Sequence, residues 1–294
     1  MPNLKEIRTR IASVSSTRQI TSAMKMVAAA KLKKAQDTVT NFKPYALKMH
    51  EIMMHMSPSI KDSDDNKYIV DRDYRQVLIV VITSNKGLCG AFNSNAIKEA
   101  VQLAERKYSK YLAADKIRYL AIGKKGYDAL RKRKVPLEEP NTEVIDSPTY
   151  ENATEIARLL IKAFLSDKYD SIDIVYNEFI NAATQKVICK QFLPILPVVT
   201  KGKKKAQQTD FLFEPSKDYM INELIPLNLR LVFYEALLDS IASEFGARMT
   251  SMHQATDNAS TLIQDLTLQY NKARQAAITN EILEIVGGAE ALKG

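Results

Sequence analysis

Glycine, cysteine and tryptophan are scarce in this chain of 294 residues, which holds nine glycines, two cysteines and no tryptophan. No glycine precedes Gly87, and only Gly246 lies between Gly202 and Gly287. Because glycine is the usual helix-ending residue, both terminal regions can form very long helices. Two cysteines are too few for a disulfide framework or a structural zinc site. We therefore expect Cys89 and Cys189 to be buried, reduced thiols.

Long apolar runs and catalytic clusters are missing as well. No stretch of 18 apolar residues occurs, and no apolar core follows the N-terminal charges, so we expect neither a membrane-spanning helix nor a secretory signal. His50, His55 and His253 lack metal-ligand spacing, and neither Ser84 nor Cys89 has a base nearby in the sequence. We predict no catalytic, cofactor or metal site, and we interpret Cys89 as a small core residue.

Residues 3–56 predict one long helix with a heptad pattern. Helix formers dominate, Pro44 is the only interior breaker, and thirteen of the sixteen heptad positions counted from Leu4 and Ile7 are apolar. The three exceptions are consecutive: Arg18, Thr21 and Lys25. At that level the apolar residues lie elsewhere: Ile20, Ala23, Met24 and Val27. We expect the helix to change its buried face there.

The C-terminal region repeats the pattern over a longer span. Fourteen of seventeen heptad positions from Leu227 to Leu283 are apolar, and Pro226 and Gly287-Gly288 suit the first turn and the end of a helix of roughly 90 Å. The N-terminal helix is the simplest partner, which predicts an antiparallel, left-handed coiled coil. Near its end this helix is apolar on every side, so something besides one helix must surround it: Ala273, Ala276, Ala277, Ile278, Ile282, Leu283, Ile285 and Val286.

The middle of the chain predicts a Rossmann-like α/β domain. Val77 to Thr83 (VLIVVIT) is typical of a buried parallel strand, and further strands are expected near 117–122, 172–179 and 186–192. Helices are expected near 95–111, 124–134 and 151–165.

The whole chain is then expected to divide into four segments: a helix over 1–56, a polar linker over 57–75, the α/β domain over 76–215 and a second helix over 216–294. The fold class is α/β with a long two-helix coiled coil. Residues 201–210 are expected to be an exposed loop.

The loops of this domain do not match a nucleotide site. The turn SNKGLCG after the first strand fits neither GxGxxG nor GxxxxGK[ST], and Gly123-Lys124-Lys125-Gly126 lacks the preceding spacing. We therefore interpret Gly87 and Gly90 as residues that permit a tight turn and close packing.

One stretch points to an anionic partner. Residues 7–36 contain no acid and seven cations: Arg8, Arg10, Arg18, Lys25, Lys31, Lys33 and Lys34. Acids normally intersperse on a merely solvated helix face. The formal charge of +8 is also uneven, because the first 56 residues hold ten basic and three acidic side chains while the last 79 hold six and ten. Nucleic acid and an acidic protein surface both fit, although the aromatic residues of nucleic-acid interfaces are missing.

Three blocks of the sequence resemble the gamma subunit of the F-type ATP synthase. They are KEIRTRIASVSSTRQITSAMKMVAAAKLKKAQ near the N-terminus, ITSNKGLCGAFN after the first strand, and ARMTSMHQATDNAS with NKARQAAITNEILEIVGGA near the C-terminus. Ile278-Thr279, Glu281, Glu284 and Gly288-Ala289 match the family signature. Asn85 departs from the aspartate usual in the family, and no role follows for the polar insertion 57–74.

This resemblance implies a non-catalytic rotor shaft. In the family, the shaft tip sits in the cavity of a hexamer of alpha and beta subunits, and the α/β domain binds epsilon and the membrane c-subunit ring. The implied place is the cytoplasmic side of the bacterial inner membrane, in a proton-translocating complex, with membrane association only through that complex and no nucleic acid bound.

Motif matching places beta- and alpha-subunit contacts at two levels of the shaft. Arg274, Gln275, Thr279 and Glu281 are expected near its top, and Arg248 lower down, where Met24 and Lys25 lie on the facing helix. Arg248 and Gln269 also suit polar, register-setting positions of a coiled coil. Two other functions stay open from the residues alone: a free-standing coiled-coil tether or nucleic-acid clamp, and a Rossmann-type enzyme.

Overall fold

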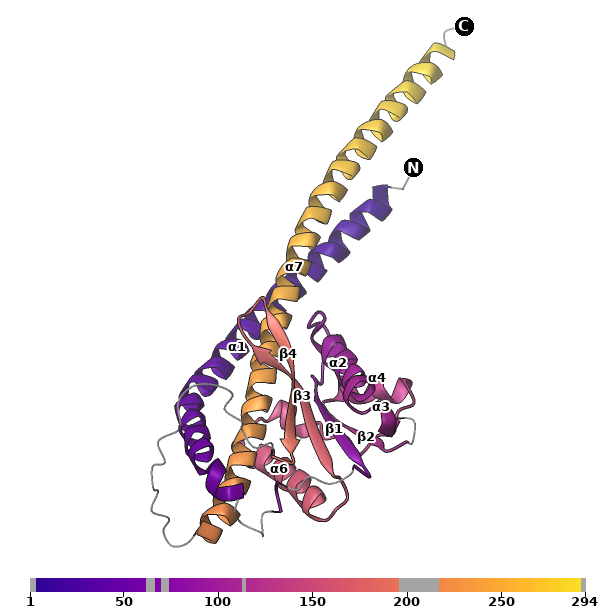
Figure 1. Cartoon of the computed structure of the whole chain (residues 1–294). Helices are drawn as coiled ribbons and strands as arrows, with labels where there is room; N and C mark the ends of the chain where they lie inside the picture. The colour runs from indigo at the N-terminus through magenta and orange to yellow at the C-terminus, as the bar shows by residue number, and fades with distance from the viewer. Residues whose placement is uncertain (1–3, 62–66, 70–73, 113–114, 196–216, 292–294) are drawn as a thin grey trace, which may run out of the picture. The chain divides into compact units, whose positions relative to one another are not determined.

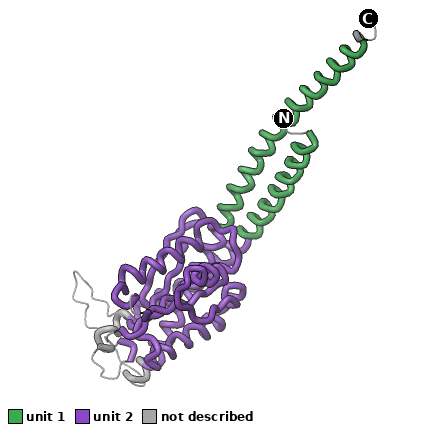
Figure 2. The backbone as a smooth tube through the Cα atoms, turned by 90° about the vertical axis from the view of Figure 1, so that its right-hand side faces the viewer, with its two compact units in different colours: residues 1–29, 248–294 green, residues 30–247 purple. Residues whose placement is uncertain are grey.

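A computed structural model describes residues 4–61, 67–69, 74–112, 115–195 and 217–291. The chain divides into two compact units, residues 1–29 with 248–294 and residues 30–247 (Figure 2). Two helices contribute to both units: α1 (Leu4–Lys61) has 58 residues and α7 (Lys217–Ala291) has 75. The absence of glycine from most of their length is what allows helices of this size.

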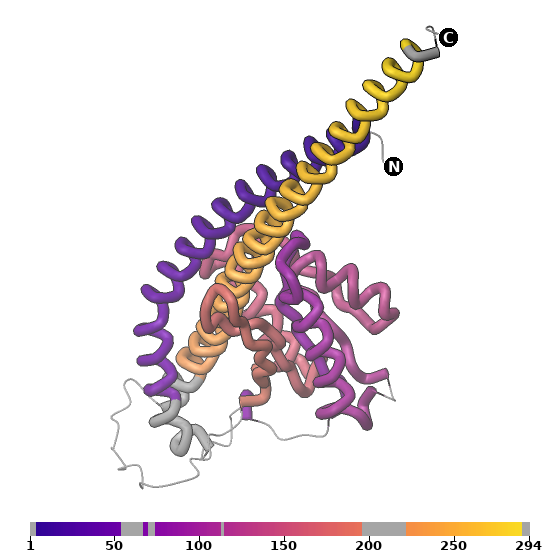
Figure 3. Tube along the Cα trace, turned by 90° about the horizontal axis from the view of Figure 1, so that it is seen from above, coloured from indigo at the N-terminus to yellow at the C-terminus, as the bar shows by residue number. Residues whose placement is uncertain are grey.

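The first unit is a pair of antiparallel helices. The start of α1 runs beside the second half of α7 (Figures 1 and 3). Met252, Ala259 and Leu266, spaced by seven, are buried on α7, and Ile7 and Ala28 are buried on α1. This confirms the predicted antiparallel pair and its heptad pattern. Within the unit, α7 continues past the first residues of α1, so its last turns have no partner helix (Figure 2).

The prediction that α1 changes its buried face near Thr21 is wrong within this single chain. Thr21 stays in the seam at 9% exposure, whereas Ile20 and Val27 are 60% and 57% exposed. The Thr21 hydroxyl hydrogen-bonds that of Thr256 on α7, with 2.9 Å between the oxygens. A polar residue is tolerated in the seam because a polar partner faces it.

The second unit contains a four-stranded sheet with the order β2-β1-β3-β4. Its strands are β1 (Val77–Ile82), β2 (Ile117–Ile122), β3 (Ser171–Phe179) and β4 (Gln185–Leu193). β1 pairs in parallel with β2 and β3, in the register Val77↔Ile117 and Val77↔Ser171, and β4 pairs antiparallel with β3. The Rossmann-like sheet is thus confirmed, with the last strand added as a hairpin because only a short turn separates it from β3.

Helices cover both faces of this sheet. They are α2 (Phe92–Lys107), α3 (Ser109–Leu112), α4 (Lys124–Lys132), α5 (Glu143–Asp146) and α6 (Tyr150–Leu165). α2 and α4 pack on the face that carries Val77, Ile79 and Val81, and α6 and α7 contact the other face, as Figure 1 shows. Every residue of β1 is buried because both of its faces are covered.

The ends of the long helices differ from the sequence-based boundaries. α1 runs to Lys61, beyond residue 56, and α7 already includes Pro226 as an interior residue. Ile225 and Leu229 beside it are buried, so apolar burial offsets the hydrogen bond that proline cannot make. Gly287 and Gly288 do not end α7, which continues to Ala291. The expected linker lies partly, and the loop 201–210 wholly, outside the described residues.

Candidate functional site

The lower set of predicted contact residues lies together in the two-helix unit. The Thr21–Thr256 hydrogen bond sets the register, so Met24 and Lys25 lie opposite α7 about one helical turn from Arg248. Met24 and Lys25 are half-buried, and Arg248 is 9% exposed. The structure thus places Met24 and Lys25 within about one turn of Arg248 along the helix pair.

The upper set lies on the part of α7 that has no partner helix. Arg274, Gln275, Thr279 and Glu281 are all exposed. The Thr279 hydroxyl donates to the backbone carbonyl oxygen of Gln275 over 2.9 Å, so it is bonded within its own helix. The side chains of Arg274, Gln275 and Glu281 are exposed to solvent. Arg274 and Glu281 are therefore available to groups outside this chain.

The last turns of α7 expose an unusual amount of apolar surface. Their exposed fractions are 48% for Ile278, 55% for Ile282, 63% for Leu283, 67% for Ile285 and 53% for Val286. Exposed Ile20, Met26 and Val27 add a smaller apolar strip on α1. Contiguous exposed apolar side chains mark interaction surfaces. The heptad pattern had signalled the first group, but it placed Ile20 and Val27 in a buried face.

The cations of residues 7–36 form no ion pair with other described residues. Arg8, Arg10 and Arg18 are exposed, and none of the seven cations forms an ion pair in the part of the chain that the structure describes. Lys31 lies over the ring of Phe245, with its Nζ 5.4 Å from the ring centre. The charge of this stretch is therefore not neutralised internally, which favours an anionic partner.

The turn after β1 is held by its own hydrogen bonds. The amide nitrogen of Asn85 donates to the Thr142 carbonyl and the Asp146 carboxylate, both over 2.8 Å, and its oxygen accepts from the Lys124 N–H. Gly90 has φ +57°, which glycine adopts without strain. A Cβ at Gly123 or Gly126 would overlap Thr83, so these glycines serve close packing. The predicted role in a tight turn is confirmed for Gly90. At Gly87 a Cβ would meet only the end of the Lys125 side chain, at an ordinary 3.8 Å, so close packing does not require glycine there.

The edge of the sheet where Rossmann-like folds bind ligands is covered by α7. In such sheets, ligands lie outside the carboxyl ends of the parallel strands. Here Ala247 packs with Cys89 and Phe92, which follow β1, and Gly246 lies against Phe179 at the end of β3. This packing places α7 against the residues that follow β1 and against the end of β3.

The two cysteines are free thiols with different surroundings. Cys89 is 2% exposed and lies in an apolar cluster, which confirms its interpretation as a core residue. Cys189 is only half-buried. Burial and the nearby carboxylate of Glu99, 3.6 Å from Sγ, raise the pKa of Cys189 to about 12. A thiol with so high a pKa is a poor nucleophile at neutral pH.

In the described ranges, no three His, Cys, Asp or Glu side chains form a group that could hold a metal ion.

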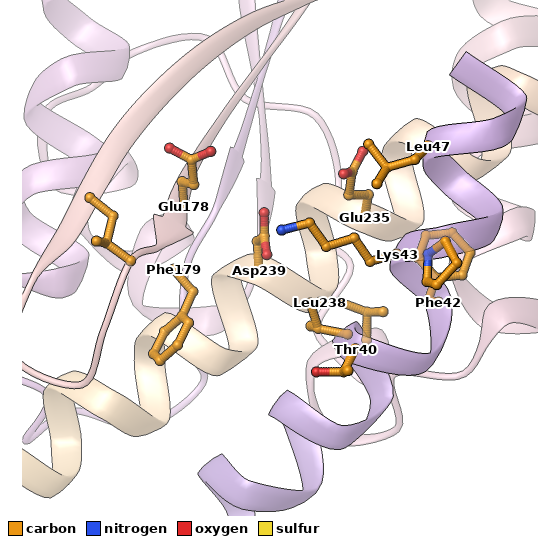
Figure 4. A pocket seen from close by; sticks show the side chains of 12 residues that line it. Thr40, Phe42, Lys43, Leu47, Glu178, Phe179, Glu235, Leu238 and Asp239 are labelled. Atoms are coloured by element: carbon orange, nitrogen blue, oxygen red, sulfur yellow. The ribbon is translucent and has the colours of Figure 1, made fainter. Parts of the chain in front are cut away.

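A cavity that the sequence did not reveal lies in the second unit, between α1, β3 and α7. Its volume is about 620 Å³, and three carboxylates and one amine line it: Glu178, Glu235, Asp239 and Lys43 (Figure 4). Burial and the neighbouring Glu235 and Glu178 raise the pKa of Asp239 to about 7. No hydrogen bond or ion pair of these carboxylates is found among the described residues. Because they come from β3 and α7, no spacing in the sequence could show the cluster.

Comparisons with known proteins identify the family. The family model described as ATP synthase matches residues 3–292. The ATP synthase gamma chains of Flavobacterium johnsoniae and Flavobacterium psychrophilum are 52% and 51% identical over 294 residues, with all of both chains covered. The chain belongs to the ATP synthase gamma-chain family. The gamma chain of a Geobacter species, 41% identical over 294 residues, is a more distant member.

Solved structures support the gamma-chain fold. The central stalk and c-ring structure of Tetrahymena thermophila mitochondrial ATP synthase has a chain with 27% identity and a TM-score of 0.59, covering 80% of this chain and 99% of that one. A chain of Euglena gracilis mitochondrial ATP synthase has a TM-score of 0.68 at 21% identity, covering 98% and 94%, which shows the fold alone.

Family membership decides between the functions that the residues left open. A gamma subunit of ATP synthase is supported over a free-standing tether or nucleic-acid clamp. The matched chain of the Tetrahymena thermophila structure, 27% identical to this one, belongs to a structure of the central stalk and c-ring. None of the helices in the described ranges is long and apolar enough to cross a membrane.

Proposed function

We propose that this gamma-family chain is the rotor shaft of a proton-translocating F-type ATP synthase. The observation that carries the proposal is the apolar, partnerless end of α7, where Leu283 and Ile285 are 63% and 67% exposed. Burying these side chains in a protein cavity is worth about 1.5–3 kcal/mol each. The resemblance to the family implies that this end of α7 sits in the cavity of a hexamer of alpha and beta subunits. Such a cavity would cover every side of the helix.

The predicted contact residues would act at two levels of this shaft. Arg274, Gln275, Thr279 and Glu281 would meet the beta subunits near the tip, and Met24, Lys25 and Arg248 would meet them lower down. The unpaired cations of the first helix would face acidic loops of the beta subunits. The absence of ion pairs to these cations among the described residues supports this role, because charges across an interface fix orientation and partner choice.

The mechanism would be mechanical, without bond chemistry on this chain. An asymmetric shaft makes different contacts with each of three catalytic sites at any one angle. Rotation then changes which conformation each site favours, a population shift driven by the difference in contact energy. The chain would therefore be a non-catalytic subunit of a complex that makes or hydrolyses ATP.

The remaining partners would bind the α/β domain. We assign the binding of epsilon and of the membrane c-subunit ring to this domain and to the adjoining helix ends. The proposed domains of the chain are 1–56, 57–75, 76–215 and 216–294. The complex would place the chain on the cytoplasmic side of the bacterial inner membrane.

A purification with matched variants tests the proposal. An affinity-tagged chain should recover alpha, beta and epsilon subunits when it is co-expressed with the rest of the complex. Leu283→Asp should reduce recovery of alpha and beta, whereas Leu159→Asp on α6, which replaces an equally exposed leucine (66% against 63%), should not. Recovery of the chain alone, together with DNA binding that falls steeply with salt, would overturn the proposal.

A further inference from the structure

The helix α7 makes an unusually close contact with the sheet at Gly246. A Cβ placed on Gly246 would lie 3.2 Å from the Ala182 Cα, 3.3 Å from the Ala182 carbonyl oxygen and 3.3 Å from the ring of Phe179. Two of these three neighbours are backbone atoms of the turn between β3 and β4. The backbone of α7 thus packs closely on the backbone of this turn, and any side chain larger than that of glycine would push these neighbours apart by a few tenths of an ångström.

Two further contacts flank Gly246 on the same helix. The Ser243 hydroxyl is fully buried and donates to the carbonyl oxygen of Asn177 on β3 over 3.0 Å. One residue after Gly246, Ala247 packs with Cys89 and Phe92 beyond the end of β1. Residues 243–247 therefore fix α7 to the ends of both central strands.

The turn that receives Gly246 is itself rigidly bonded. The Asn181 side-chain oxygen accepts from the N–H groups of Ala183 and Thr184 over 3.0 and 2.8 Å. The backbones of Asn181 and Thr184 also pair with each other in both directions. A turn with this many internal bonds cannot move aside cheaply. About two to three turns earlier, by contrast, Asp239 and Glu235 of α7 border the open cavity.

We propose that residues 243–247, centred on Gly246, form the clamp through which torque passes between the α/β domain and α7. The inference rests on the proposed rotor function. Side-chain contacts can relax by changing rotamer, but a backbone-to-backbone contact transmits a displacement directly. Because α7 is one uninterrupted helix from Lys217 to Ala291, a rotation imposed at Gly246 is carried along the same helix toward residues 274–286.

The test measures coupling in the intact complex. In inverted membrane vesicles, the ratio of ATP-driven proton pumping to ATP hydrolysis is compared for the wild-type chain, Gly246→Ala and Gly246→Val. Alanine is a better helix former than glycine, so a loss in Gly246→Ala would not come from a weaker helix. The control is Ala183→Val, which enlarges an exposed residue of the same turn. We expect a partial loss of the ratio for Gly246→Ala, a larger loss for Gly246→Val and none for the control.

The pumping ratio distinguishes a torque clamp from a contact that only stabilises the fold. A merely structural role would reduce the amount of complex but not pumping per ATP hydrolysed. If Gly246→Val fails to fold, Gly246→Ala and Ser243→Ala decide, because each perturbs the contact by one atom or one hydrogen bond. The clamp proposal would be overturned if Gly246→Ala and Ser243→Ala both kept the wild-type ratio of proton pumping to ATP hydrolysis. It would also be overturned if Gly246→Val gave the same ratio as Ala183→Val. Failure of the wild-type chain to support pumping would instead reject the rotor function.

Discussion

The hydroxyl groups of Thr21 on α1 and Thr256 on α7 hydrogen-bond each other in the seam of the helix pair, with 2.9 Å between the oxygens. Each threonine also has a backbone carbonyl within reach: Arg18 at 3.1 Å and Met252 at 2.8 Å. The pair replaces an apolar heptad layer by a mutually satisfied polar one. Because each hydroxyl depends on the other, the two should be energetically coupled.

Thr21→Val and Thr256→Val should therefore be non-additive. Each single substitution leaves the other hydroxyl without its partner across the seam and should lower the free energy of unfolding by about 1 kcal/mol. The double variant places two isosteric apolar side chains in the layer and should lose less than the sum. Urea unfolding followed by circular dichroism measures all four proteins. Thr267→Val, at an exposed α7 threonine with the same backbone bond, is the control; additive effects would contradict the coupling.

The heptad pattern predicted the helix pair but not the behaviour of its polar layer. A count of apolar positions treats Thr21 as a misfit, although a facing threonine makes it a good seam residue. The pattern also could not show that Pro226 would lie inside α7, since that depends on tertiary burial of the residues around it. Local sequence patterns specify periodicity, while partners in space decide which exceptions are tolerated.

The candidate site was predictable to the extent that it lies on single helices. Arg274 to Glu281 follow one another on α7, and their exposure follows from the absence of a facing helix. The acidic cavity and the Gly246 contact join elements far apart in the chain, with Ala182 and Gly246 separated by more than 60 residues. The spacing of residues in the sequence cannot reveal contacts between elements that lie so far apart in the chain.

Arg274→Ala should separate partner binding from folding. Arg274 is exposed, and alanine forms helix at least as well as arginine, so the helicity of the isolated chain should not change. Loss of an arginine anchor should weaken association with the alpha and beta subunits by about tenfold and lower ATP synthesis by the complex. Lys132→Ala, at an exposed cation on α4, is the control. Normal assembly and ATP synthesis in Arg274→Ala would refute the assigned contact.

Asn85→Asp should destabilise the turn after β1. The substitution removes the amide that donates to Thr142 and Asp146 and places a second carboxylate beside Asp146. We expect a loss of about 1–3 kcal/mol near neutral pH, measured as a lower urea midpoint. Asn85→Ala removes the same donors without adding charge, so an equal loss in both variants would reject the repulsion.

Asp239 should make the chain less stable as the pH rises. Its pKa is raised to about 7 by burial and by Glu235 and Glu178, while Lys43 and Lys190 oppose the shift. Between about pH 4 and pH 7 the unfolded chain has lost this proton and the folded chain keeps it, so stability falls across that window and is lowest above it. At lower pH both states hold the proton, and the penalty disappears.

Asp239→Asn should remove this penalty. The variant should be more stable than the wild-type chain by about 1–2 kcal/mol at pH 8, a modest gain because solvent screens a partly exposed carboxylate, and the difference should vanish near pH 4. Urea unfolding at a series of pH values measures it, with Asp37→Asn, at an exposed carboxylate on α1, as the control. A gain that is independent of pH would show that the amide stabilises by packing or hydrogen bonding. The charge of Asp239 among its acidic neighbours would then not be the cause.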